Sequence, residues 1–127
     1  MDHAALVSFD IEIGRRTVNA LDESKRAPNV ALWAKLPEYE DWRLVIASDR
    51  LNQESSRTAY EEINAALRSS NIPFHQRPTI FLKSMSSPMI EELRNVFGKA
   101  KDTYGMRLGG QTFGDQYIED AFVYRIQ

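Results

Sequence analysis

Two apolar segments joined by a short acidic loop constrain the fold of this chain more than any other feature of its sequence. Residues 30–36 and 42–48 are rich in β-favouring side chains, and the five residues between them suit a hairpin loop. Successive side chains of a strand point to opposite faces, and here both alternating sets are largely apolar. A strand that is apolar on both faces belongs inside a sheet covered on both sides. The sequence therefore predicts a central hairpin with packed layers on each side.

A five-residue loop also predicts the register of this hairpin. It places Leu36 opposite Trp42, so Trp42 is expected to be buried against Leu36. The other face of the hairpin then carries Trp33 between two basic residues, Lys35 and Arg43.

Proline, glycine and serine delimit the remaining elements. Helical spacing of apolar residues predicts three helices, and the first carries Phe9 and Ile13 in its apolar stripe and Ser8 as its cap. Gly14 lies inside that helix, which predicts a neighbouring element packed closely against it. The predicted helices are residues 9–24, 55–68 and 87–98, and the further predicted strands are residues 79–83, 106–112 and 117–126.

The order of these elements, α-ββ-α-β-α-ββ, predicts an α+β fold in which three helices surround a five-stranded mixed, mainly antiparallel sheet. The chain has 127 residues, which fits a single domain spanning residues 1–127. Residues 1–7 are expected to be flexible.

The last two predicted strands form a second hairpin around Gly114, which supplies the positive φ of a tight turn. This turn places Gly109 opposite Asp120 and makes Arg107 a diagonal neighbour of that carboxylate. A half-buried carboxylate needs a cationic partner, so an ion pair between Arg107 and Asp120 is expected. Gly109 and Gly110 together indicate a bulge or a close backbone contact.

Composition and motifs exclude most kinds of active site. The chain contains no cysteine and only two histidines, and it carries no phosphate-binding loop, nucleophile elbow or zinc-binding motif. We therefore predict no catalytic residue, no metal site and no cofactor.

No apolar run approaches the length of a membrane span and the N-terminus has no basic region, so no membrane contact is expected and a cytoplasmic location is favoured.

Three stretches, residues 11–16, 36–47 and 117–126, resemble a family of small single-domain bacterial proteins that has no assigned activity. The resemblance spans most of the chain. It implies a bacterial, intracellular protein with one domain, and it carries no catalytic residue over to this sequence.

Basic residues beside aromatic ones form the first candidate site. The chain has eleven arginines and five lysines, and arginine suits planar contacts with carboxylate or phosphate groups. The structural alternative is that the basic side chains extend past a half-covered tryptophan to water. The candidate ligand-binding residues are Trp33, Arg43, His75, Arg77 and Arg107.

The acidic hairpin loop forms the second candidate site. Its residues Glu38, Tyr39, Glu40 and Asp41 combine carboxylates with an aromatic side chain, which suits contact with a basic protein partner. The alternative is an ordinary solvated turn.

The favoured hypothesis is a small protein-interaction or regulatory module without catalytic activity of its own, whose partner is another protein encoded nearby. A homo-oligomer is left open. Binding of a nucleic acid or nucleotide is the second hypothesis, and a carboxylate-dependent hydrolase or nuclease is the third. Sixteen basic and eighteen acidic residues give a net charge of −2, which does not favour polyanions. Convergence of Arg43, His75, Arg77, Lys83 and Arg107 in one cleft would favour the second hypothesis.

Overall fold

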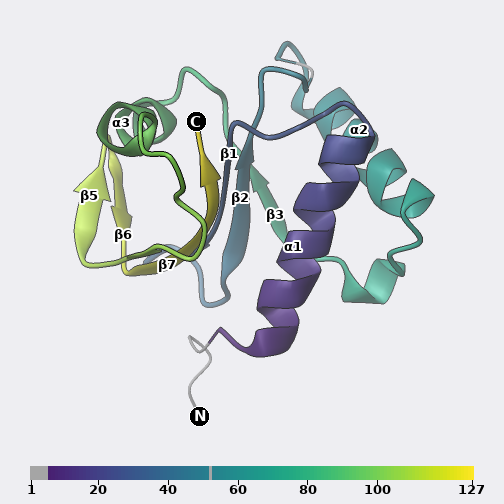
Figure 1. Ribbon diagram of the computed structural model, residues 1–127, viewed down its shortest axis with the longest axis horizontal. Helices are drawn as coiled ribbons and strands as arrows, with labels where there is room; N and C mark the ends of the chain where they lie inside the picture. The colour runs from purple at the N-terminus through teal and green to yellow at the C-terminus, as the bar shows by residue number, and fades with distance from the viewer. Residues whose placement is uncertain (1–5, 52) are drawn as a thin grey trace.

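A five-stranded mixed sheet forms the centre of the computed structural model, which describes residues 6–51 and 53–127 (Figure 1). Most of the segment predicted to be flexible, residues 1–7, lies outside these described residues. In spatial order the sheet consists of β3 (Ile80–Leu82), β2 (Arg43–Ala47), β1 (Val30–Lys35), β7 (Asp120–Ile126) and β4 (Arg107–Leu108). Only the pair of β2 and β3 is parallel.

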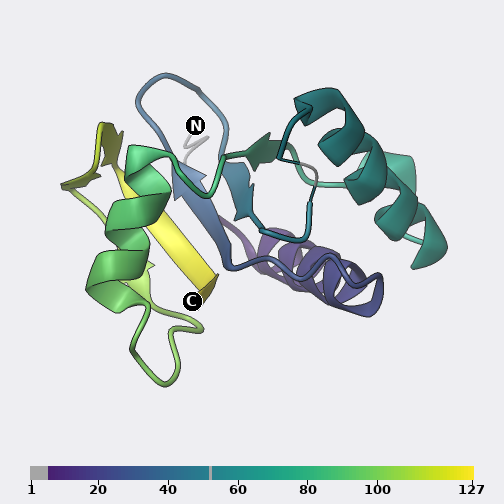
Figure 2. The ribbon, with the colours of Figure 1, turned by 90° about the horizontal axis from the view of Figure 1, so that it is seen from above.

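The described part of the chain contains three α-helices and one short 3-10 helix. These are α1 (Ser8–Glu23), α2 (Ser56–Ser69), α3 (Pro88–Phe97) and η1 (Phe74–Gln76). Figure 2 shows α1 and α2 on one side of the sheet, and α3 on the other side beside a two-stranded sheet of β5 (Gln111–Phe113) and β6 (Gln116–Ile118). We call the two sides the α1–α2 face and the α3 face. The predicted α+β class, the three helices and the mixed five-stranded sheet are confirmed.

The hairpin of β1 and β2 forms as predicted, but its register differs by one residue. Trp33 pairs with Leu44, and a shift of one residue exchanges the faces to which the side chains point. Trp42 is buried, as expected, but it packs on the α1–α2 face, whereas Leu36 packs on the α3 face. The prediction that Trp33 shares a face with Arg43 is also wrong. Because both faces of this hairpin are apolar, the hydrophobic pattern does not distinguish between the two registers.

The C-terminal hairpin has the predicted register. Leu108 pairs with Ala121, which places Gly109 opposite Asp120, and Arg107 forms the expected ion pair with Asp120 at 2.7 Å. The hairpin bends at its glycines and so contributes to two sheets. A Cβ atom on Gly109 would lie 2.9 Å from a backbone carbonyl oxygen of the facing strand.

A bulge in β7 directs two consecutive side chains towards α1. The register between β1 and β7 shifts between Ala31 and Leu32, and both Tyr124 and Arg125 contact α1. Arg125 donates hydrogen bonds to both carboxylate oxygens of Asp22, each at 2.9 Å. This contact raises the pKa of Arg125 and ties the C-terminal end of α1 to the sheet.

The exposed edge of β3 is covered by a side chain of α2. The hydroxyl of Tyr60 accepts a hydrogen bond from the Leu82 amide at 3.0 Å and lies 3.4 Å from the Ile80 carbonyl oxygen. This hydroxyl pairs backbone groups that would otherwise be open to another strand.

None of the helices in the described part of the chain has the length and apolar character that crossing a bilayer requires.

Candidate functional site

A cleft of about 320 Å³ opens between the first turns of α1, the end of the β1–β2 loop and the connector that follows η1. Figure 1 shows the N-terminal end of α1 and the β1–β2 loop at the lower end of the molecule. Both tryptophans of the chain line the cleft. The aromatic and charged lining residues are Phe9, Asp10, Trp33, Asp41, Trp42, His75 and Arg77.

Hydrogen bonds hold Trp33 in the buried wall of the cleft. Its indole Nε1–H lies 3.0 Å from both the Asp10 carbonyl oxygen and the Tyr124 hydroxyl oxygen, and Tyr124 in turn donates to the Ile11 carbonyl at 2.6 Å. Gly14 allows this approach, because a Cβ atom there would lie 2.7 Å from the indole nitrogen of Trp33. The predicted close packing at Gly14 is confirmed. Burial raises the pKa of Tyr124, so its hydroxyl stays neutral and can donate.

The first turn of α1 is capped differently from the prediction. The helix begins at Ser8, and its cap residue is Val7. The carboxylate of Asp10 accepts a hydrogen bond from the Val7 amide at 3.2 Å, a favourable place for negative charge at a helix N-terminus. Asp10 therefore serves the helix and lines the cleft at once.

Large aromatic side chains beside this cleft remain exposed. Phe9 lines the cleft with 57% of its surface exposed, although helical spacing predicts it in the core. Phe74, the first residue of η1, is 81% exposed. The neighbouring Arg77 is held in place, since its Nε donates to the Ile72 carbonyl at 3.1 Å and its guanidinium carbon lies 5.6 Å from the centre of the Phe74 ring.

The cleft brings together three of the five predicted ligand-binding residues, Trp33, His75 and Arg77. Arg107 is separate from them, on β4 in its ion pair, and Arg43 points to the α3 face. The convergence of basic residues that would favour a nucleic-acid site therefore does not occur.

Arg43 and Lys83 instead cover aromatic rings on the α3 face. The guanidinium carbon of Arg43 lies 4.1 Å from the centre of the Tyr39 ring, and the Lys83 ammonium lies 5.2 Å from the centre of the Phe81 ring. Tyr39 and Phe81 pack edge to face, with ring centres 5.8 Å apart. All four side chains are half-buried. The structural alternative thus applies to Arg43, with Tyr39 in place of Trp33 as the covered ring.

The acidic loop is divided between the two faces. Glu38 accepts a hydrogen bond from the Gln116 side chain at 3.0 Å, and Tyr39 packs into the α3 face. Glu40 and Asp41 are exposed, and neither carboxylate forms an ion pair within the described part of the chain. Of the four candidate partner-binding residues, Asp41 lines the cleft.

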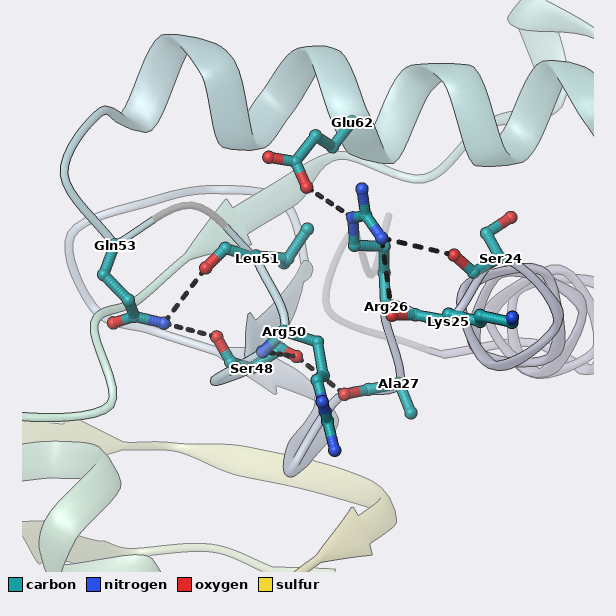
Figure 3. Close-up of polar contacts among 9 residues, drawn as sticks. All are labelled: Ser24, Lys25, Arg26, Ala27, Ser48, Arg50, Leu51, Gln53 and Glu62. Atoms are coloured by element: carbon teal, nitrogen blue, oxygen red, sulfur yellow. Dashed lines mark hydrogen bonds and ion pairs between the residues drawn. The ribbon is translucent and has the colours of Figure 1, made fainter.

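At the opposite end of β2, polar side chains are paired with one another (Figure 3). Arg26 binds the carboxylate of Glu62, which joins the α1–β1 connector to α2. Ser48 donates to the Ala27 carbonyl at 2.6 Å, and Gln53 donates to the Ser48 carbonyl at 2.6 Å. These contacts occupy the side chains of Arg26, Ser48 and Gln53 with partners from the α1–β1 and β2–α2 connectors and from α2.

Potential metal ligands do not form a binding group in the residues that the structure describes. No group of three or more histidine, aspartate or glutamate side chains in this range is placed to hold a metal ion. The expectation that the protein carries no metal stays a prediction.

Comparisons of the chain with protein-family models, with curated proteins and with solved structures find no match.

Proposed function

We propose that the protein is a small interaction or regulatory module without catalytic activity of its own, and that a partner protein binds at the cleft beside α1. The observation that carries this proposal is the exposure of two phenylalanines, Phe9 and Phe74, near a cleft lined by Trp42. Exposed apolar side chains that gather around a concave surface are typical of interaction sites. Aromatic side chains also dominate the binding energy of many protein interfaces.

The charges around the cleft favour a protein partner over a polyanion. Asp10 and Asp41 line the cleft together with His75 and Arg77, so a phosphate backbone would meet carboxylates as well as a guanidinium. A protein interface commonly has an apolar centre with a mixed polar rim. The proposed setting is the cytoplasm of a bacterium, with a partner encoded by a neighbouring gene.

The test is partner capture by the full-length protein from the native host, with paired variants. The double variant Phe9→Ala/Phe74→Ala removes the exposed rings, while Tyr117→Ala removes an exposed aromatic ring from β6 and serves as the control. Truncating exposed side chains should change stability by less than about 0.5 kcal/mol, so loss of binding would not reflect unfolding. The partner should be retained by the wild type and the control and lost in the double variant. Equal retention by all three proteins would place the interface elsewhere.

Nucleotide or nucleic-acid binding is the second candidate, because Trp33, His75 and Arg77 do meet in the cleft. At near-physiological salt, mixed DNA and RNA should bind with dissociation constants of about 100 μM or weaker, which is at or beyond the weak end of non-specific binding by DNA-binding proteins. Low-micromolar binding that weakens in Arg77→Ala, with a flatter dependence on salt, would establish this candidate instead.

A further inference from the structure

We propose that the partner inserts an extended basic segment into the cleft, with an apolar side chain against Phe9 and Trp42 and a flanking lysine or arginine at Glu40 and Asp41. This inference rests on the proposed function and names the chemistry of the partner. It concerns the same surface, with the acidic end of the β1–β2 loop added as the charged part.

The size of the cleft favours a short segment. Its volume of about 320 Å³ accommodates one or two side chains rather than a folded surface. Small-molecule ligand pockets in proteins typically have volumes of about 300–1,000 Å³, so this cleft lies at the small end of that range. Trp42 is 8% exposed and lies deep in the cleft, whereas Phe9 is largely exposed at its edge. An inserted apolar side chain would therefore cover both rings.

The charge around the cleft favours a cation in the occupant. Asp10, Glu40 and Asp41 place three carboxylates on or next to its walls. The basic groups of the lining are the guanidinium of Arg77 and the imidazole of His75. The guanidinium of Arg77 is already engaged by the Ile72 carbonyl and the Phe74 ring. Complementary charge at an interface rim sets which partner is accepted and speeds association.

Neighbouring cations of the chain do not neutralise these carboxylates. The Lys35 ammonium nitrogen lies 3.3 Å from a carboxylate oxygen of Glu119 and donates a hydrogen bond to the Tyr39 carbonyl. The Arg43 guanidinium lies over the Tyr39 ring. Among the described residues, Glu40 and Asp41 therefore have no cationic partner. A basic residue of the occupant would supply it.

Tryptophan fluorescence reports on the cleft, because both tryptophans of the chain line it. The full-length protein is titrated with three capped peptides, Ala-Lys-Leu-Lys-Ala, Ala-Glu-Leu-Glu-Ala and Ala-Lys-Gly-Lys-Ala, and tryptophan fluorescence is followed. The first peptide should bind, with a dissociation constant between about 10 μM and 1 mM. The charge-reversed and the glycine peptides should bind several-fold more weakly.

A matched pair of variants tests the charged part. Glu40→Gln/Asp41→Asn should weaken binding of the lysine–leucine peptide by about three- to tenfold, as expected for the loss of two exposed charge pairs. Asp115→Asn alters an exposed carboxylate in the β5–β6 turn and should leave the affinity unchanged.

Three results with the peptides, the variants and the isolated protein would overturn the inference. They are binding of the acidic peptide at least as tight as that of the basic one, equal binding by Glu40→Gln/Asp41→Asn and the wild type, and a homodimer in sedimentation that Phe9→Ala dissociates. The proposed function fails separately, when partner capture does not depend on Phe9 and Phe74. A captured partner that depends on these rings but contacts them with an acidic segment would overturn only the inference.

Discussion

The two faces of the central sheet are covered by different means. On the α1–α2 face, side-chain hydrogen bonds tie helices to strands, as in the contacts of Tyr124 with α1, Arg125 with Asp22 and Tyr60 with β3. On the α3 face, a ten-residue helix and the small β5–β6 sheet pack mainly through apolar side chains. Two side-chain hydrogen bonds add to this packing: the Glu92 carboxylate of α3 accepts from the Gly114 amide at 2.8 Å, and Arg94 donates to the Gln127 carbonyl at 2.6 Å. Both faces therefore have an apolar core, but their directional contacts differ. On the α1–α2 face these contacts join helices to strands of the central sheet, whereas on the α3 face they join α3 to the β5–β6 turn and to the residue that follows β7.

The faces also differ at the end of the sheet where β1 and β2 are joined. On the α3 face this end is filled by Tyr39 and Phe81. Arg43 lies over the Tyr39 ring and Lys83 over the Phe81 ring. On the α1–α2 face it is left open as the cleft, with Phe9 exposed at its edge. In the proposed function, this end of the α1–α2 face is the surface that a partner covers, whereas the same end of the α3 face is already filled by side chains of the protein.

The largest expected effect comes from the buried wall of the cleft. Trp42→Ala removes a side chain that is part of the α1–α2 core, and it should lower the free energy of unfolding by about 3–5 kcal/mol. Chemical denaturation measures this loss. An unchanged midpoint would show that the ring is not packed against the core and that the comparison of the two faces is wrong at this point.

Small changes in the two cores test whether the stabilities of the two faces are independent of each other. Ile13→Val shortens a core side chain on α1, and Ile90→Val does the same on α3. Each should cost about 0.5–1.5 kcal/mol, and the double variant should equal their sum within about 0.5 kcal/mol. A larger coupling would mean that the sheet transmits packing changes between its faces.

Two glycines, one on each side of the central sheet, sharpen the comparison of the faces. Gly114 has φ +61° and a Cβ atom there would overlap the backbone of Pro88 at the start of α3, so Gly114→Ala should cost about 2–4 kcal/mol. Gly14 is helical and its obstacles are the side-chain ends of Tyr124 and Trp33. Gly14→Ala should cost less, because side chains move more easily than backbone and alanine favours a helix by about 1 kcal/mol. Thermal or chemical unfolding should give this order, and the reverse order would contradict it.

Sequence patterns were sufficient to predict the register of a hairpin only where the sequence marks the turn or distinguishes the buried face from the exposed one. The C-terminal hairpin could be predicted with its register because Gly114 marks the turn, and counting outward from a turn centred on Gly114 and Asp115 pairs Gly109 with Asp120. The first hairpin was predicted with the wrong register, because Trp33 and Leu32 are both apolar neighbours and neither face is marked as outward.

The candidate site was predicted only in part. His75 and Arg77 were proposed beside Trp33, and the cleft contains all three. The exposure of Phe9 was missed, because helical spacing shows which side of a helix faces inward but not where the core beneath it ends. Tyr39 was expected to be a partner contact, yet it fills the α3 face, since the path of a loop depends on tertiary packing.

A modest effect is expected for the hydroxyl that ties α1 to the sheet. Tyr124→Phe removes the donor to the Ile11 carbonyl and the acceptor for Trp33 Nε1, which should cost about 1–2 kcal/mol near neutral pH. Burial raises the pKa of Tyr124 above its ordinary value of 10.0, so above that pH the unfolded chain releases this proton before the folded protein does. The stability that the hydroxyl supplies is thus complete below about pH 10 and declines as the pH rises further. Urea denaturation of the wild type and Tyr124→Phe at about pH 7, 9 and 11 should show a difference that is constant between the first two and smaller at the third. A difference that persists unchanged at the highest pH would show that Tyr124 ionises as readily in the folded protein as in the unfolded chain.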